Sequence, residues 1–104
     1  MSIFYSAAIG PPRQDGLTLV EIKFGDPANN DVVVPAAVDA IKALDLQGGR
    51  GILFHGPCSV PVAMALAHAV AHLYQFVACF DPKMGKFVVV ISHTPGLRPG
   101  DLIA

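Results

Sequence analysis

Apolar and polar residues alternate with a period close to two over residues 17–24. This alternation predicts a half-buried strand. A short apolar run over residues 3–9 ends at the loop sequence Gly10-Pro11-Pro12, which predicts a first strand that pairs with the second. Further along, Val38, Ile41 and Leu44 recur at helical spacing. An amphipathic helix is therefore expected over residues 35–46, with Pro35 at its first position.

The second half of the chain is more uniformly apolar and divides into shorter elements. Residues 51–54 form a continuous apolar run of the kind found in a central strand covered on both faces. The further elements expected are a helix at 60–74, a strand at 76–80, an antiparallel strand at 87–91 and a short edge strand at 101–104. The pattern therefore predicts an α/β fold with a mixed sheet of about five strands and two main helices.

Composition indicates one domain that associates with copies of itself. The chain has 104 residues, of which 53% are hydrophobic and 14% charged, whereas a soluble domain averages roughly 25% charged residues. Such a small domain has a large surface to cover with few charges, so part of it is expected to be buried in a dimer or tetramer. The net charge of −1 argues against a binder of duplex DNA, which needs a basic face.

No Asp, Glu, Lys or Arg occurs between Gly51 and Phe80, and a run of this length is long enough to cross a bilayer. We favour a non-membrane protein because the run contains histidines and prolines and divides into elements of ordinary length. The first eight residues have no basic start, so no signal peptide is expected. Cys58 and Cys79 lack CxxC spacing, which favours reduced thiols in the cytoplasm.

The turn that follows the strand at 51–54 is a candidate anion site. It comprises His55, Gly56, Pro57, Cys58 and Ser59. A strand-to-helix turn points backbone N–H groups at solvent in the positive field of the helix end, which suits a phosphate. The alternative, a turn with no ligand, stays open. Cys58 offers a rival chemistry as a nucleophile assisted by His55, although a cysteine among apolar neighbours is usually a small buried hydrophobe.

Three polar groups at the ends of apolar elements form the second candidate site: His72, Asp81 and His93. Two imidazoles and a carboxylate can ligate a divalent transition metal or perform acid-base catalysis on a phosphodiester. The alternative is that each is a surface or turn residue. His68 lies four residues before His72 and therefore on the same helix face.

Several segments resemble the small CRISPR-associated ring nucleases of type III systems, a group sometimes fused to an AAA-type ATPase. They are the Gly-Pro turn at 56–57, the Leu-Ala-His helix at 66–68, the run at 76–85 (Phe-Val-Ala-Cys-Phe-Asp-Pro-Lys-Met-Gly), the run at 88–93 (Val-Val-Val-Ile-Ser-His) and Arg-Pro-Gly-Asp at 98–101. The resemblance covers residues 51–103 and implies a compact Rossmann-like domain.

The resemblance further implies that the protein binds cyclic tetra-adenylate and cuts it into linear products with manganese. The family's catalytic and metal-binding His, Asp and His fall on His72, Asp81 and His93, with His68 the alternative to His72 in another register. The family also binds its cyclic ligand between oligomers, so the site is expected to be completed by a neighbouring copy. The turn at 55–59 and His68 are expected to bind the ligand. Two alternatives remain: a sponge that binds the messenger without cutting it, and a metal-dependent RNA 3′ exonuclease that removes adenylate tails.

Overall fold

Six strands form one mixed sheet whose order follows the chain, β1-β2-β3-β4-β5-β6. The computed structural model describes residues 3–104; Met1 and Ser2, the start of the segment in which no signal peptide is expected, lie outside this range. The elements are β1 (Tyr5–Ile9), β2 (Thr18–Phe24), α1 (Asn30–Lys42), β3 (Gly49–His55), α2 (Val60–Val70), β4 (Tyr74–Asp81), β5 (Lys86–Ser92) and β6 (Leu102–Ile103). The predicted α/β fold with two main helices is confirmed, and the short edge strand brings the sheet to six strands.

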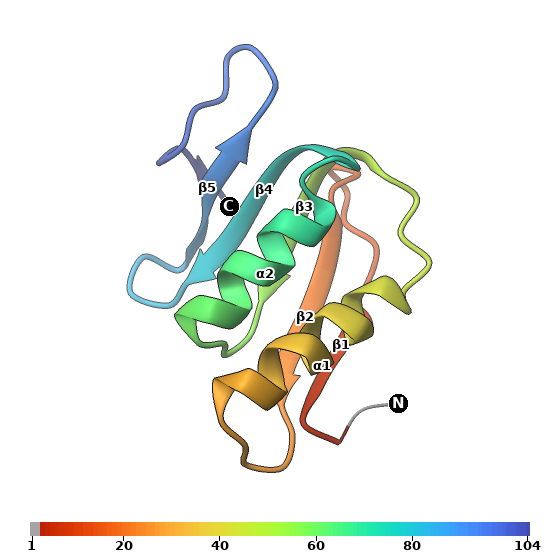
Figure 1. Ribbon diagram of the computed structural model, residues 1–104. Coiled ribbons are helices and arrows are strands. Elements are labelled where there is room, and N and C mark those ends of the chain that lie inside the picture. Colours follow the sequence, from red (N-terminus) through yellow and green to blue (C-terminus); the bar gives the residue numbers. More distant parts are fainter. Residues whose placement is uncertain (1–2) are drawn as a thin grey trace.

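The centre of the sheet is parallel and its margins are antiparallel. Strands β2, β3 and β4 run in the same direction, whereas β1, β5 and β6 each run against their neighbour. Helix α1 connects β2 to β3 and α2 connects β3 to β4, so the core is two consecutive βαβ units of the Rossmann-like kind. Both helices lie on one face of the sheet (Figure 1), because right-handed crossovers that advance in one direction return on the same side.

Hydrophobic residues fill both faces of the central strand β3. Ile52 and Phe54 point into the core beneath the two helices, whereas Leu53 belongs to a second cluster with Phe76 on the opposite face. Within residues 3–104 no helix covers that second face. Leu17 from the loop between β1 and β2 and the partly buried Leu97 from the loop between β5 and β6 pack against it instead. The expectation that residues 51–54 form a strand covered on both faces is therefore confirmed.

Helix α1 begins earlier than predicted. It starts at Asn30, because the Asn29 carbonyl accepts hydrogen bonds from the Val32 and Val33 N–H groups at 2.9 Å. Pro35 consequently lies inside the helix and not at its first position. The run of β-branched residues before Pro35 concealed this start, since such residues have modest helix propensity.

Helix α2 ends earlier than predicted, at Val70 with Ala71 as its C-cap. Its predicted last residues form a turn, and Tyr74 already belongs to β4. The uncharged run from 51 to 80 is thus divided among β3, α2 and β4. Within residues 3–104 neither helix has the length and hydropathy needed to cross a bilayer.

Candidate functional site

The parallel strands β3 and β4 end side by side, and their C-terminal ends collect polar groups. Phe54 of β3 pairs with Cys79 of β4, so His55 and Asp81 reach the same edge of the sheet. The His55 ring packs edge-on against Phe80 with 4.7 Å between centroids. Its Nδ1 atom lies 4.0 Å from Oε1 of Glu21. This is the edge at which α/β folds generally bind ligands.

The turn after β3 has a tightly constrained backbone at Gly56. Its φ angle is +135°, and a Cβ atom at this position would collide with the carbonyl oxygen of Ile22. Only glycine fits such a close approach between two backbones. Pro57, the next residue, is held in place by a residue of β1, because the Tyr5 hydroxyl donates a hydrogen bond of 2.8 Å to the Pro57 carbonyl.

Ser59 ends the turn and caps α2. Its Oγ accepts a hydrogen bond from the Val62 N–H at 3.3 Å and donates one to Oδ1 of Asn30 at 2.8 Å. Within residues 3–104 the backbone N–H groups of Cys58 and Ser59 donate no hydrogen bond. These donors lie at the positive end of an 11-residue helix, an arrangement that can bind an anion.

Asp81 uses one carboxylate oxygen to shape the turn between β4 and β5. Its Oδ1 accepts hydrogen bonds from the backbone N–H groups of Lys83 and Met84 at 2.8 and 3.3 Å. In the part of the chain that the structure describes, Oδ2 accepts no hydrogen bond. Asp81 therefore combines the predicted turn role with an oxygen free to contact another molecule.

His72 and His93 lie at the other end of the sheet. His72 is exposed in the turn between α2 and β4 and lines a cavity of about 230 Å³ together with Lys42 and Leu73. The His93 N–H donates a hydrogen bond of 2.7 Å to the carbonyl of Gln75, at the start of β4. Both histidines therefore sit where β4 begins. His68 is exposed on α2.

One chain does not bring the predicted triad together. Gln75, beside His93, and Asp81 are six residues apart in one strand, a separation of about 20 Å at 3.3 Å per residue. Within residues 3–104 no group of three His, Cys, Asp or Glu side chains is placed to hold a metal ion. A single chain therefore does not fit manganese on His72, Asp81 and His93.

The two thiols are not activated. Both cysteines are free. Both residues are exposed, and neither is the small buried hydrophobe that the sequence alternative described. Partial burial by neighbouring atoms, with a smaller contribution from Cys79, still raises the pKa of the Cys58 thiol. Burial and then the Asp81 charge raise the pKa of Cys79. A raised pKa reduces the thiolate population that nucleophilic catalysis requires, which argues against the thiol alternative.

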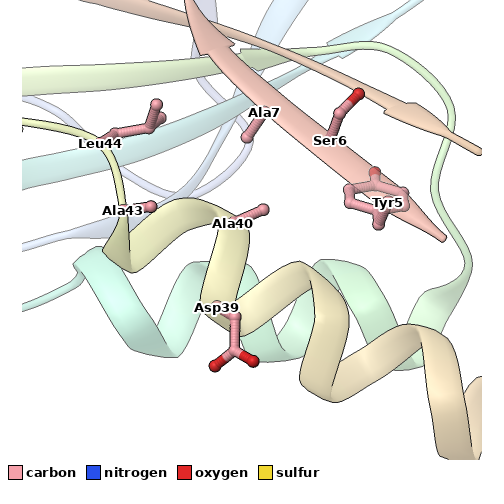
Figure 2. A pocket seen from close by; sticks show the side chains of 7 residues that line it. All are labelled: Tyr5, Ser6, Ala7, Asp39, Ala40, Ala43 and Leu44. Carbon is pink, nitrogen blue, oxygen red and sulfur yellow. The ribbon is translucent and has the colours of Figure 1, made fainter. Parts of the chain in front are cut away.

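A cavity of about 650 Å³ lies away from these groups, between β1 and α1. Figure 2 shows Tyr5 and Ala7 on the strand opposite Ala40 on the helix, while Asp39 points away from the strand. The lining of this cavity mixes small apolar side chains with Ser6 and Asp39, and it includes none of the predicted site residues. Glu21 is the polar residue at the functional edge that the sequence analysis missed, because alternation alone assigns it to an ordinary solvent-facing strand position.

The sequence that forms this site matches a known protein family. Residues 27–104 match the family model described as CRISPR-associated protein (Cas_csx3). No curated protein matches the chain. The match extends from just before α1 to the last residue, and so includes the turn at 55–59, Asp81 and both histidines.

Proposed function

The chain belongs to the family of CRISPR-associated Cas_csx3 proteins, and from this premise we propose that it is a ring nuclease. It binds cyclic tetra-adenylate and cleaves it to linear oligoadenylates, which switches off type III CRISPR signalling. The site lies between two copies of the chain. His72 and His93 come from one copy and Asp81 from the next.

The observation that carries this proposal is the position of the candidate groups at opposite ends of one sheet. Asp81 and the turn at 55–59 lie where β3 and β4 end, whereas His72 and His93 lie where β4 begins. Copies stacked end to end in the same orientation bring the Asp81 end of one against the histidine end of the next. Such a heterologous contact assembles from two chains a set of groups that one chain keeps apart.

The ligand's phosphates are bound at the N-terminus of α2. The unpaired N–H groups of Cys58 and Ser59 supply donors, and the helix end supplies a positive field. A protein with net charge −1 can thus bind a small polyanion without a basic surface. His55 lies beside this turn and in contact with Phe80, where it can contact a base of the ligand.

The chemistry needs little from the protein, because each linkage of the ring carries its own nucleophile, the ribose 2′-OH. Holding that oxygen in line with the phosphorus supplies much of the acceleration. An imidazole of the histidine end that is not bound to metal accepts the proton of the 2′-OH and returns a proton to the 5′ oxygen. The bond from phosphorus to the 2′ oxygen forms as the bond to the 5′ oxygen breaks. The N–H groups at the helix end stabilise negative charge on the phosphate. In the assembled site manganese would take its ligands from His72, His93 and the partner copy's Asp81 carboxylate, with one imidazole left unbound for the proton transfer. The ion would stabilise negative charge on the phosphate.

Incubation with cyclic tetra-adenylate and manganese tests the proposal. The wild-type protein should convert the ring to linear products, and His72→Ala should lower the rate by about 10² or more, as expected for loss of a general acid-base group. His68→Ala distinguishes the two exposed histidines of the α2 segment. The proposal expects a smaller loss than in His72→Ala, and the reverse order would assign the catalytic role to His68. Tight binding with an unchanged ring would instead establish a sponge. Faster shortening of linear adenylate RNA than of the ring would establish the exonuclease alternative.

A further inference from the structure

A hollow beside the turn after β3 carries two charged groups that the proposed function does not use. Its volume is about 360 Å³, within the usual range of small-molecule sites, roughly 300–1,000 Å³. Glu21 and Lys23 of β2 line it together with His55. We call this hollow, with these three side chains, the β2 pocket.

The register of three strands places the polar groups of the β2 pocket in two adjacent rows. Glu21 pairs with Ala8 of β1 on one side and with His55 of β3 on the other. Lys23 pairs with Ser6 of β1. Directly paired residues have Cβ atoms about 4.5–5.5 Å apart, and residues two apart in a strand share a face. One face of the sheet therefore presents a carboxylate, an ammonium group and an imidazole close together.

Glu21 and Lys23 keep their hydrogen-bonding capacity for another molecule. Val20 and Ile22, which alternate with them, are buried in the core beneath the helices, so the two charged side chains project from the opposite face of the sheet. Within residues 3–104 the Glu21 carboxylate accepts no hydrogen bond and the Lys23 ammonium group donates none. The 4.0 Å between Oε1 of Glu21 and Nδ1 of His55 is too long for a hydrogen bond.

The β2 pocket adjoins the donors that bind phosphate. Gly56 and Pro57 line the pocket and directly precede the two residues whose N–H groups lie at the start of α2. The His55 ring is held edge-on against Phe80 and offers an aromatic surface on which a base can stack. A nucleotide with its phosphate at the helix end can therefore place its base in the β2 pocket.

We propose that the β2 pocket selects adenine, an inference that rests on the proposed function, whose ligand carries adenine bases. Adenine presents an amino group beside a ring nitrogen, whereas guanine presents an oxygen in place of the amino group. The Glu21 carboxylate accepts a hydrogen bond from the amino group, and the Lys23 ammonium group donates one to the ring nitrogen. An oxygen in place of the amino group would face the carboxylate, and two acceptors cannot form a hydrogen bond.

The pairing of opposite charges makes a carboxylate compatible with a phosphate site. Alone, the Glu21 carboxylate would repel the ligand's phosphates, and Lys23 on the same face offsets its charge. Both residues precede 27–104, the part of the chain that matches the family model. The match therefore assigns neither residue, and selection of the base comes from the β1–β2 hairpin.

Binding of two cyclic ligands without manganese tests the inference by isothermal titration calorimetry. They are cyclic tetra-adenylate and cyclic tetra-inosinate, in which an oxygen replaces each 6-amino group. The wild-type protein should bind the adenylate ring at least about 10-fold more tightly. In Glu21→Gln this preference should fall to about 3-fold or less, because a carboxamide can also donate to the oxygen. Asp39→Asn is the matched control, since it removes an exposed carboxylate from α1, and it should keep the wild-type preference.

The ratio of the two affinities separates base recognition from phosphate binding, because removal of one negative charge strengthens the binding of both rings alike. Equal affinity of the wild-type protein for the two rings would overturn the inference alone, as would a preference that Glu21→Gln retains in full or that Asp39→Asn loses equally. Binding of neither ring would overturn the inference and the proposed function together. A strong preference for an adenylate ring that stays uncut in manganese would count against the proposed function alone.

A second substitution guards against a change in folding. Glu21 has a side chain that is 56% exposed, so circular dichroism of Glu21→Gln should match the wild type. Glu21→Ala removes the acceptor altogether and should likewise reduce the preference to about 3-fold or less. Full retention of the preference in Glu21→Ala would also overturn the inference.

Discussion

Asp81 and His93 lie at opposite ends of the same sheet, although Asp81 ends one strand and His93 directly follows the next. Asp81 is the last residue of β4 and pairs with Lys86 at the start of β5, whereas His93 comes just after β5 and bonds to Gln75 near the start of β4. Because β4 and β5 are antiparallel, the end of one is the beginning of the other. A site that needs both groups must therefore involve two chains.

The Tyr5 hydroxyl should stabilise the turn at the functional edge. The hydroxyl donates a hydrogen bond to the Pro57 carbonyl, and Tyr5 is only 1% exposed. Tyr5→Phe should therefore lower the free energy of unfolding by about 0.5–1.5 kcal/mol, the usual net value of one hydrogen bond. Urea denaturation measures the change. Tyr74→Phe is the control, since Tyr74 is similarly buried but its hydroxyl makes no hydrogen bond within residues 3–104; an equal loss in both variants would contradict the assignment.

Cys58 should be dispensable for catalysis. Burial raises its thiol pKa, so little thiolate is present at neutral pH. Cys58→Ser should keep a cleavage rate within about two-fold of the wild type, because a serine retains the size and backbone of the ligand-binding turn. In a Cys79→Ser background, alkylation of Cys58 should reach half its maximal rate above pH of about 8.5, the ordinary thiol value. Abolished cleavage in Cys58→Ser would restore the thiol mechanism.

Stability should depend on pH through Asp15. Arg13 donates hydrogen bonds to the Asp15 carboxylate, one of them from Nη2 to Oδ2 at 2.7 Å. These hydrogen bonds are the main reason why the pKa of this carboxyl lies below its usual range. A lowered folded-state pKa stabilises the fold above the unfolded value of about 3.9, and this stabilisation is lost as the pH falls through the folded value. The pair is partly exposed, so it contributes about 1 kcal/mol or less.

Asp15→Asn should accordingly be less stable than the wild type at pH 7, and the two should converge as the pH falls through the lowered pKa of Asp15. Thermal unfolding followed across this range gives the comparison. Asp45→Asn serves as control, since the Asp45 carboxylate accepts no hydrogen bond in the described part of the chain. A constant difference between Asp15→Asn and the wild type at every pH would show that the ion pair is not responsible.

The architecture was predictable because hydrophobic periodicity reports burial directly. The apolar run at 51–54 identified the central strand, and the turn residues around Gly56 located the start of α2. The start of α1 was not predictable in the same way. Pro35 is typical of a first helical turn, yet the helix begins a turn earlier because the Asn29 carbonyl accepts hydrogen bonds from the Val32 and Val33 N–H groups.

The individual residues of the candidate site were predictable, but their positions relative to one another were not. Sequence pattern correctly indicated polar residues where apolar elements end, but it ignored strand direction. The predicted antiparallel pairing of 76–80 with 87–91 already implied that Asp81 and His93 are far apart in one chain. The contact between His55 and Glu21 was missed, since it arises from the register of β2 against β3, which local pattern does not specify.

Mixing two inactive variants tests most directly whether the site is shared between copies. His72→Ala and Asp81→Asn should each abolish cleavage of cyclic tetra-adenylate, the first by loss of the imidazole and the second by loss of the carboxylate. In an equimolar mixture about a quarter of the end-to-end contacts join an intact histidine end to an intact Asp81 end, so about a quarter of the wild-type rate should return. No recovery on mixing, with both variants folded and associated as in the wild type, would contradict a shared site.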